Sequence, residues 1–270
     1  MAVKLGLQAF PPMTSGFLRF TIGCICVFLW ARASGVAILP SRDERPWLLL
    51  IGLVFTAQIG LMNLGLDHTT ATNGAVLIST NPLFGVIFAH LIVPGDRIGI
   101  RKAIGVAIAF VGVALVLTRS GGLTTPVARS GDLIVLMSAC LLGLRLAISG
   151  RLLQHGNEVR LAFWQMVTSL PLFAAGAFAW EEIRWERVGF APVAGILYQG
   201  MVVAGLAFTV NFYLMRRFTP SVMISFNFVA PVAGVLLGIV ILNEQPSSGL
   251  LGGMGLVALG LVLITRAVSK

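Results

Sequence analysis

Nine apolar stretches, each close to 20 residues long, constrain the fold more than any other feature of this sequence. An α-helix needs about 20 mostly apolar residues to cross the ~30 Å hydrocarbon core of a bilayer. Lipid offers no hydrogen-bond partner to an open backbone, and the stretches lack the strict alternation of a membrane β-barrel. We therefore predict transmembrane helices at residues 13–31, 47–66, 71–93, 102–118, 131–150, 160–180, 192–215, 219–242 and 249–265.

The composition agrees with an all-α polytopic membrane protein. Hydrophobic residues make up 57% of the chain and charged residues only 11%, whereas soluble domains carry about 25% charged residues. The net charge of +9 comes from basic residues scattered between the apolar stretches, so we predict membrane lipid and a small solute as partners and no nucleic acid. Basic residues gather on one side of the predicted topology, which makes the C-terminus cytoplasmic.

The sequence lacks the patterns that would indicate an enzyme. It contains no GxSxG nucleophile motif and no HExxH zinc motif, and none of the span centres contains Asp or Glu. We therefore predict no catalytic residue, no metal site and no cofactor. The same absence of acidic residues disfavours a carrier that is driven by protonation of a buried carboxylate.

The chain repeats itself at a separation of nearly 150 residues. Residues 82–86 match residues 231–235, and the acidic turn residues Asp96 and Glu244 follow at equivalent positions. Five spans follow Ser120, and this odd number means that a second copy enters the membrane from the opposite side. An inverted repeat is a signature of secondary transporters, whose halves meet around a site near the midplane.

These features resemble the drug/metabolite transporter superfamily, specifically proteins with two tandem EamA-like domains. The resemblance covers about residues 3–266. It implies two inverted repeats at 1–118 and 131–266 in a ten-helix carrier of the inner membrane, commonly an exporter of amino acids or other small metabolites. It is carried by Leu18-Arg19-Phe20, Asn81-Pro82-Leu83-Phe84, Gly95-Asp96-Arg97, Phe163-Trp164-Gln165, Ala230-Pro231 and Asn243-Glu244-Gln245-Pro246.

The start of the chain departs from the family pattern. Residues 2–12 look like the tail of the family's first helix, so nine complete spans are predicted where the family has ten. We expect the missing part upstream of Met1. In the alternative, a true nine-helix variant lacks one wall of the central cavity and is a membrane protein that does not transport. A sugar or nucleotide-sugar transporter is a further alternative, and its phosphorylated ligand would depend on Arg19 or Arg145.

Polar side chains within the spans are the candidates for a substrate pathway, because burying them in lipid is costly. Arg19 lies two turns inside its span and either faces the protein interior or snorkels outward. Uncharged polar groups beside aromatic rings suit a small amphipathic solute such as an amino acid, although each group could instead bond between helices. The pathway candidates are Arg19, Gln58, Asn63, Asn73, Ser79, Asn81, Trp164, Gln165, Tyr198, Gln199, Asn211, Tyr213 and Asn227.

Proline and glycine positions predict how the helices bend and pack. Pro82, Pro171 and Pro231 should each kink a span, because proline removes a helix hydrogen bond. Glycines at heptad or four-residue spacing predict close helix contacts, within the monomer or in a homodimer. These glycines are Gly105, Gly112, Gly234, Gly238, Gly253 and Gly260.

Overall fold

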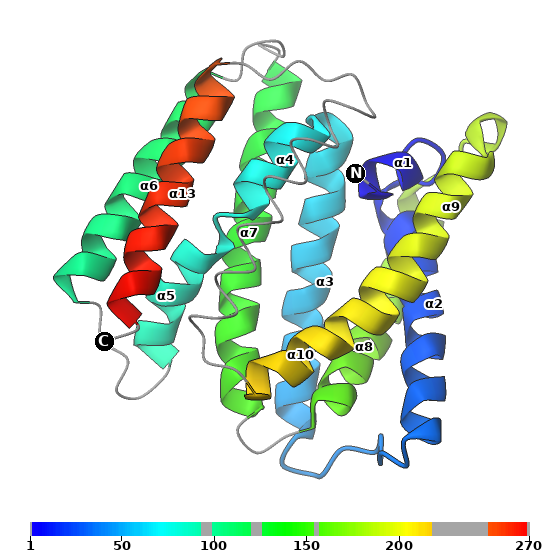
Figure 1. The fold of residues 1–270 in the computed structure, drawn as a ribbon. Coiled ribbons are helices and arrows are strands. Elements are labelled where there is room, and N and C mark those ends of the chain that lie inside the picture. The colour runs from blue at the N-terminus through cyan, green and yellow to red at the C-terminus, as the bar shows by residue number, and fades with distance from the viewer. Residues whose placement is uncertain (1, 93–98, 120–125, 154–156, 218–247, 269–270) are drawn as a thin grey trace. The chain divides into compact units, whose positions relative to one another are not determined.

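The computed structural model describes residues 2–92, 99–119, 126–153, 157–217 and 248–268 (Figure 1). Among them, six segments are long and apolar enough to cross a membrane. They are 12–33, 45–68, 71–92, 129–152, 158–180 and 190–214, and shorter apolar helices cover 103–115 and 251–260. Each of these segments coincides with a predicted span. The predicted span at 219–242 lies outside the described residues.

The described secondary structure is helical throughout. The α-helices are α1 (Ala2–Gly6), α2 (Pro12–Ala33), α3 (Arg45–His68), α4 (Ala71–Ile78), α5 (Asn81–Ile92), α6 (Ile100–Arg119), α7 (Pro126–Leu152), α8 (Glu158–Trp180), α9 (Phe190–Tyr198), α10 (Phe208–Arg217) and α13 (Ser248–Val268). A short 3₁₀ helix, η1 (Trp185–Arg187), precedes α9, and a π-helix, η2 (Gln199–Ala207), joins α9 to α10.

Local side chains fix several helix ends. Thr70 and Asn157 accept hydrogen bonds from backbone N–H groups at the starts of α4 and α8. Ser41 and Glu44 exchange hydrogen bonds before α3, as in a capping box. Gly35, just past α2, has φ +66°, a left-handed conformation that glycine adopts without steric cost. The sequence therefore encodes these boundaries locally.

The chain forms two compact units, and each takes helices from both halves of the sequence. Of the described residues, unit 1 contains 64–92, 99–119, 126–147 and 248–268, and unit 2 contains 2–63, 148–153 and 157–217. Two boundaries fall inside α3 and α7, and a third follows the end of α10 at Arg217. The compact units therefore differ from the two sequence repeats, because helices distant in sequence supply each other's packing surfaces.

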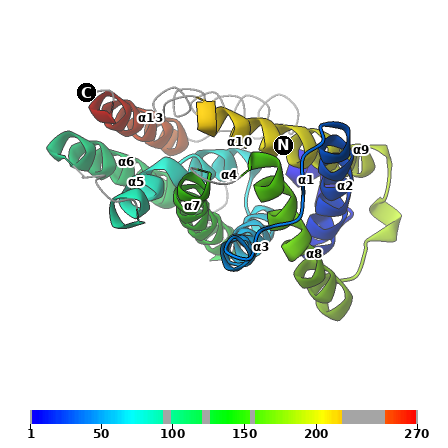
Figure 2. The same cartoon turned by 90° about the horizontal axis from the view of Figure 1, so that it is seen from below.

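In unit 1, α6 and α13 pack side by side in antiparallel directions (Figures 1 and 2). A Cβ atom built at Gly112 would lie 2.7 Å from the carbonyl oxygen of Gly253, and one built at Gly260 would lie 2.4 Å from that of Gly105. Small residues allow such close backbone approach between membrane helices. Val113 and Val257 are buried beside this crossing, in a cluster that also includes Leu77 and Leu83.

Unit 2 is built around α2, which packs against α8 and η2. Its apolar core centres on Phe20, whose ring centroid lies 4.7 Å from that of Phe55 and 5.7 Å from that of Phe173. One turn further along α2, a Cβ atom at Gly23 would lie 2.7 Å from Ala204 Cβ in η2. The wider π-helix therefore approaches α2 through small residues.

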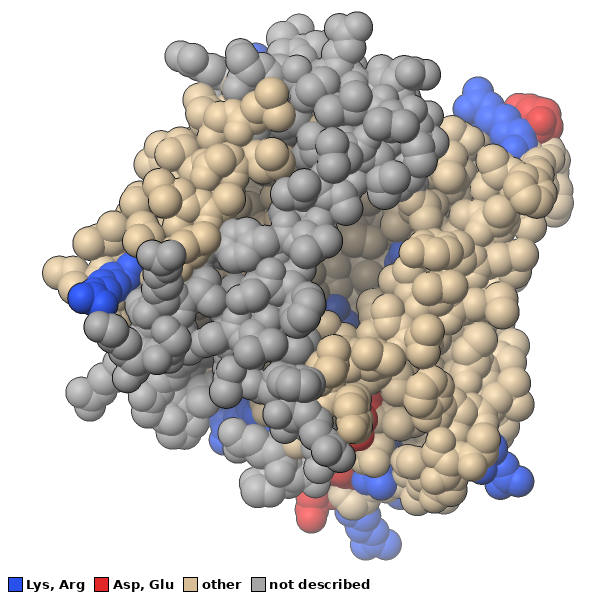
Figure 3. Space-filling model, in the orientation of Figure 1, with Lys and Arg blue, Asp and Glu red and all other residues tan. Residues whose placement is uncertain are grey.

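Charged groups are rare on the outer surface of α9 and α10. In Figure 3, the described surface of α9 and α10 is uncharged along most of its length, with charged groups near its margins. Large apolar side chains such as Phe178, Phe190 and Leu197 are exposed on α8 and α9. This distribution is expected of helices whose outer surfaces contact lipid tails.

Candidate functional site

Arg19 is the most unusual polar residue of unit 2, because it is a buried cation inside a membrane-length helix. It lies about 10 Å along the axis of α2 from Pro12, and only 3% of its surface is exposed. Arg19 therefore does not snorkel outward. Its Nη1 donates to Gln199 Oε1 (2.8 Å), and its Cζ lies 4.4 Å from the centroid of the Phe20 ring. One edge and one face of the guanidinium thus have partners.

Gln199 is oriented by two hydrogen bonds at the start of the π-helix. Its Oε1 accepts from Arg19, and its Nε2 donates to the Ala2 carbonyl oxygen (3.0 Å). Gln199 is 1% exposed. The amide is therefore fixed between α1 and α2. A π-helical turn in an otherwise α-helical span is frequent at functional sites, and this one begins at the residue that holds the buried cation.

Unit 2 contains two further buried side chains with an unpartnered oxygen, Ser15 and Asn63. Ser15 precedes Arg19 by four residues, so their side chains share one helix face. Ser15 is fully buried, and its Oγ has no hydrogen-bond partner among the described residues. Asn63 donates from Nδ2 to the Pro12 carbonyl oxygen (2.9 Å), while its Oδ1 lacks a partner within the same residues. Gln58 and Gln165 are also buried in unit 2.

In unit 1, the predicted kink at Pro82 is a break between two helices. Helix α4 ends at Ile78 and α5 begins at Asn81, which places Pro82 in the first turn of α5. The neighbouring polar side chains bond to carbonyl oxygens at the break: Ser79 Oγ to Ala75, Thr80 Oγ1 to Leu77 and Asn81 Nδ2 to Ile78. The Asn81 bond takes the place of the N–H that Pro82 lacks, whereas the Ser79 and Thr80 hydroxyls add to backbone bonds that Ala75 and Leu77 already accept.

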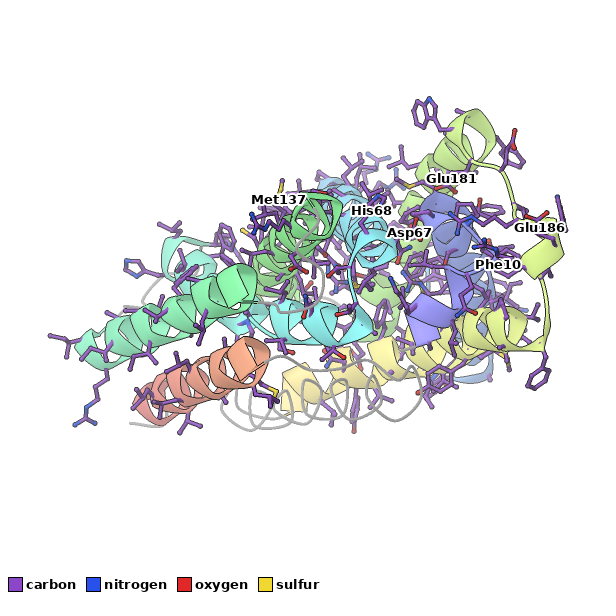
Figure 4. All side chains as sticks on the ribbon, turned by 90° about the horizontal axis from the view of Figure 1, so that it is seen from above. Phe10, Asp67, His68, Met137, Glu181 and Glu186 are labelled. Carbon is purple, nitrogen blue, oxygen red and sulfur yellow. The ribbon has the colours of Figure 1, made fainter. Side chains whose placement is uncertain are left out.

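A buried carboxylate, Asp132, lies at the start of the apolar part of α7. It accepts hydrogen bonds from Thr69 Oγ1 and, at 3.3 and 3.4 Å, from Asn73 Nδ2. Asp132 is 3% exposed. Asp67 and His68, labelled in Figure 4, end the neighbouring helix α3. The pathway candidate Asn73 therefore holds a carboxylate, which sequence reasoning overlooked because Asp132 stands at the edge of its apolar stretch.

The other candidates are spread over both units. Trp164 donates from Nε1 to the Ile38 carbonyl oxygen (2.8 Å), and Tyr198, Asn211 and Tyr213 are exposed. Pro171 lies within α8, which continues on both sides of it. Asn227, Pro231, Gly234 and Gly238 lie outside the described residues. Within the part of the chain that the structure describes, no three His, Cys, Asp or Glu residues form a metal-binding group.

Each end of the α2–α8 pair has a polar contact that joins distant parts of the sequence. At one end, Glu181 accepts hydrogen bonds from the backbone N–H groups of Met13 and Thr14, both at 2.7 Å, and from Thr14 Oγ1 (Figure 4). At the other end, Arg160 forms an ion pair with Glu44 and donates from Nε to the Ala37 carbonyl oxygen. Neither contact follows from a sequence motif.

The Arg160–Glu44 pair gives a small, pH-dependent contribution to stability. Partial burial acts to raise the pKa of Glu44, but the hydrogen bond from the Ser41 backbone and the contact with Arg160 outweigh it and lower the pKa below its ordinary 4.5. Because the folded-state pKa is depressed, the contribution is complete above about pH 4.5 and is lost as the pH falls through the folded-state pKa. For a partly exposed pair we expect about 0.5–1 kcal/mol.

The variant Glu44→Gln should therefore unfold at a lower temperature than wild type at pH 7, and the difference should shrink below pH 4.5. Thermal unfolding in one detergent across this pH range measures it. Asp43→Asn is the control, since Asp43 is an exposed neighbour. A difference between Glu44→Gln and wild type that does not change with pH would contradict the assignment.

Comparison with known proteins relates the whole chain to membrane transporters. A model of the EamA-like transporter family matches residues 1–118 and 129–266. The chain is 26% identical to a protein of Escherichia coli (strain K12) named uncharacterized inner membrane transporter YedA. The alignment is 273 residues long and covers 97% of this chain and 84% of that protein. It is 20% identical over 271 residues to the uncharacterized transporter YoaV of Bacillus subtilis (strain 168), covering 100% and 92%.

A solved structure has the same fold. A crystal structure matches this one with a TM-score of 0.71 at 24% sequence identity, covering 99% of this chain and 95% of the other.

Proposed function

The chain belongs to the EamA-like transporter family, whose members are membrane transporters and not enzymes. From this premise we propose that it is a secondary carrier. It exports a small organic metabolite, such as an amino acid, by alternating access. The protein is multi-pass. We propose that it lies in the inner membrane with its C-terminus in the cytoplasm, following the excess of basic residues on that side.

The observation that carries this proposal is the antiparallel contact between α6 and α13. These helices occupy equivalent positions in the two sequence repeats, where Gly105 corresponds to Gly253 and Gly112 to Gly260. The two contacts are equivalent to each other: Gly112 packs against Gly253, and their counterparts Gly260 and Gly105 pack against each other in the same way. A two-fold axis in the membrane plane would generate this reciprocal arrangement. It supports an inverted repeat, on which alternating access in many carriers depends.

Two further features support a solute pathway. The break between α4 and α5 falls in the middle of the 71–92 span, and discontinuous helices in transporters commonly line a binding site. In unit 2, a buried cation and several buried amides lie at membrane depth. Burying such groups is costly, so their presence in a transporter favours a role in contact with solute.

Flux measurements with purified protein in proteoliposomes test the proposal. Vesicles are loaded with a labelled panel of amino acids, short monocarboxylates, their neutral amides, sugar phosphates and nucleotide sugars. We expect saturable efflux of at least one amino acid or similarly small metabolite, with protein-free vesicles as the control. Efflux restricted to phosphorylated solutes would favour a sugar-phosphate or nucleotide-sugar carrier instead. No saturable flux of any solute in the panel would overturn the carrier proposal.

A further inference from the structure

Arg19 has an unused binding edge. Its guanidinium carries five N–H donors in a planar fork, and the nitrogens Nε and Nη2 have no hydrogen-bond partner among the described residues. These two nitrogens lie on the same edge of the guanidinium plane, with parallel N–H bonds. A carboxylate accepts such a pair through both of its oxygens. The bond from Nη1 to Gln199 holds the fork in place, and the unbonded edge is buried within the protein.

The charge of Arg19 is also unbalanced. No carboxylate of the described residues lies within ion-pair distance of it. A buried cation is costly without a counter-charge, and the contact with the Phe20 ring replaces only part of the lost hydration. A monoanion would neutralise the site, whereas a doubly charged phosphoryl group would leave one negative charge buried. The charge balance therefore favours a carboxylate.

Ser15 adds a hydroxyl to the same helix face. Residues separated by four positions on a helix bring their Cβ atoms to about 5–6 Å. The Ser15 hydroxyl is buried and without a partner in the described part of the chain, so it can donate to an anion bound at Arg19. The Arg19 guanidinium and the Ser15 hydroxyl are both buried on neighbouring turns of α2. Together they offer hydrogen bonds that an anionic ligand could accept.

We propose that Arg19 and Ser15 bind the carboxylate group of the transported solute, which makes the substrate a small organic acid with a single carboxylate. This inference rests on the proposed carrier function and adds the chemical class of its substrate. Gln199 is a positioning residue, since its amide bonds to both the guanidinium and the Ala2 carbonyl oxygen.

Equilibrium binding to the purified full chain tests the site without requiring transport. The probes are the twenty amino acids and linear monocarboxylates of two to eight carbons, each paired with its neutral amide, together with phenyl phosphate as a dianion. We expect at least one carboxylate to bind at least about tenfold more tightly than its amide. Arg19→Lys should reduce this ratio, Arg19→Gln should bring it close to one, and Ser15→Ala should weaken carboxylate binding about fivefold.

The control is Arg32→Gln, which removes an exposed arginine from the same helix and should leave the ratio unchanged. The ratio of carboxylate to amide affinity separates recognition from a structural role, because a general loss of structure weakens both ligands. If Arg19→Gln fails to fold, the same ratio is measured for Arg19→Lys and Ser15→Ala. A wild-type ratio near one, a ratio unaffected in folded Arg19 variants, or tighter binding of phenyl phosphate would each overturn the site.

The flux panel then distinguishes the two proposals. Saturable efflux of neutral solutes, with equal binding of carboxylates and amides, would refute the carboxylate site and leave the carrier intact. Binding of carboxylates dependent on Arg19, without flux of any solute, would refute the carrier and leave the site.

Discussion

Gly260→Ala is expected to destabilise the protein by about 3 kcal/mol, near the upper end of the usual cost of overpacking. The added Cβ atom would lie 2.4 Å from the Gly105 carbonyl oxygen and 2.8 Å from the Ala109 backbone nitrogen. Backbone atoms cannot rotate away as a flexible side chain can, so α6 and α13 must move apart. Their separation also weakens packing around Val113 and Val257.

The matched control is Gly255→Ala in the same helix, where an added Cβ atom meets nothing within 4 Å. This change should be neutral or stabilise the protein by up to about 1 kcal/mol through helix propensity. Thermal unfolding of both variants and wild type in the same detergent gives the comparison. Equal stabilities of Gly260→Ala and Gly255→Ala would show that the two helices do not approach as closely as the structure indicates.

The second large effect is expected from Glu181→Ala, at about 2–3 kcal/mol. Helix α2 begins at Pro12, and its N-cap residue, Pro11, provides no side-chain cap. The Glu181 carboxylate supplies the missing acceptor for Met13 and Thr14, and its negative charge interacts favourably with the positive end of the helix dipole. Its removal leaves two N–H groups without a protein acceptor.

Hydrogen exchange locates this effect. Amides in the first turns of α2 should exchange faster in Glu181→Ala, with an intermediate rate in Glu181→Gln, which keeps an acceptor oxygen but loses the charge. Glu182→Ala, at the exposed neighbouring residue, should match wild type. If the first turn of α2 is equally protected in Glu181→Ala and Glu182→Ala, the carboxylate does not cap this helix.

Much of the fold could be predicted because its signals are local. The length and apolarity of each stretch indicated the helices, and Pro82 indicated a disturbance in the 71–92 span. The structure has a break there instead of a kink, and the side chains of Ser79, Thr80 and Asn81 bond to carbonyl oxygens of the last turn of α4. The glycine spacing indicated close packing, but it did not say that α6 and α13 are partners.

The candidate site was predictable only in part. Arg19 and Gln199 were both among the polar candidates, yet the bond between them joins residues 180 positions apart. Ser15 was not among the predicted candidates, although it stands one turn from Arg19 within the same predicted span. Asp132 was missed because it stands at the edge of a span, where a carboxylate is normally solvated.

The sequence by itself determined that this chain crosses a membrane as helices and that its two halves are related. These properties depend on the apolarity, length and repetition of contiguous segments, and lipid enforces helical hydrogen bonding within each segment. Only the tertiary structure decided which helices form each compact unit, that Glu181 caps α2 and that Arg19 keeps one edge unpaired. Apolar helices gain little by choosing one apolar partner over another in lipid, so these pairings depend on shape and on polar contacts between distant residues.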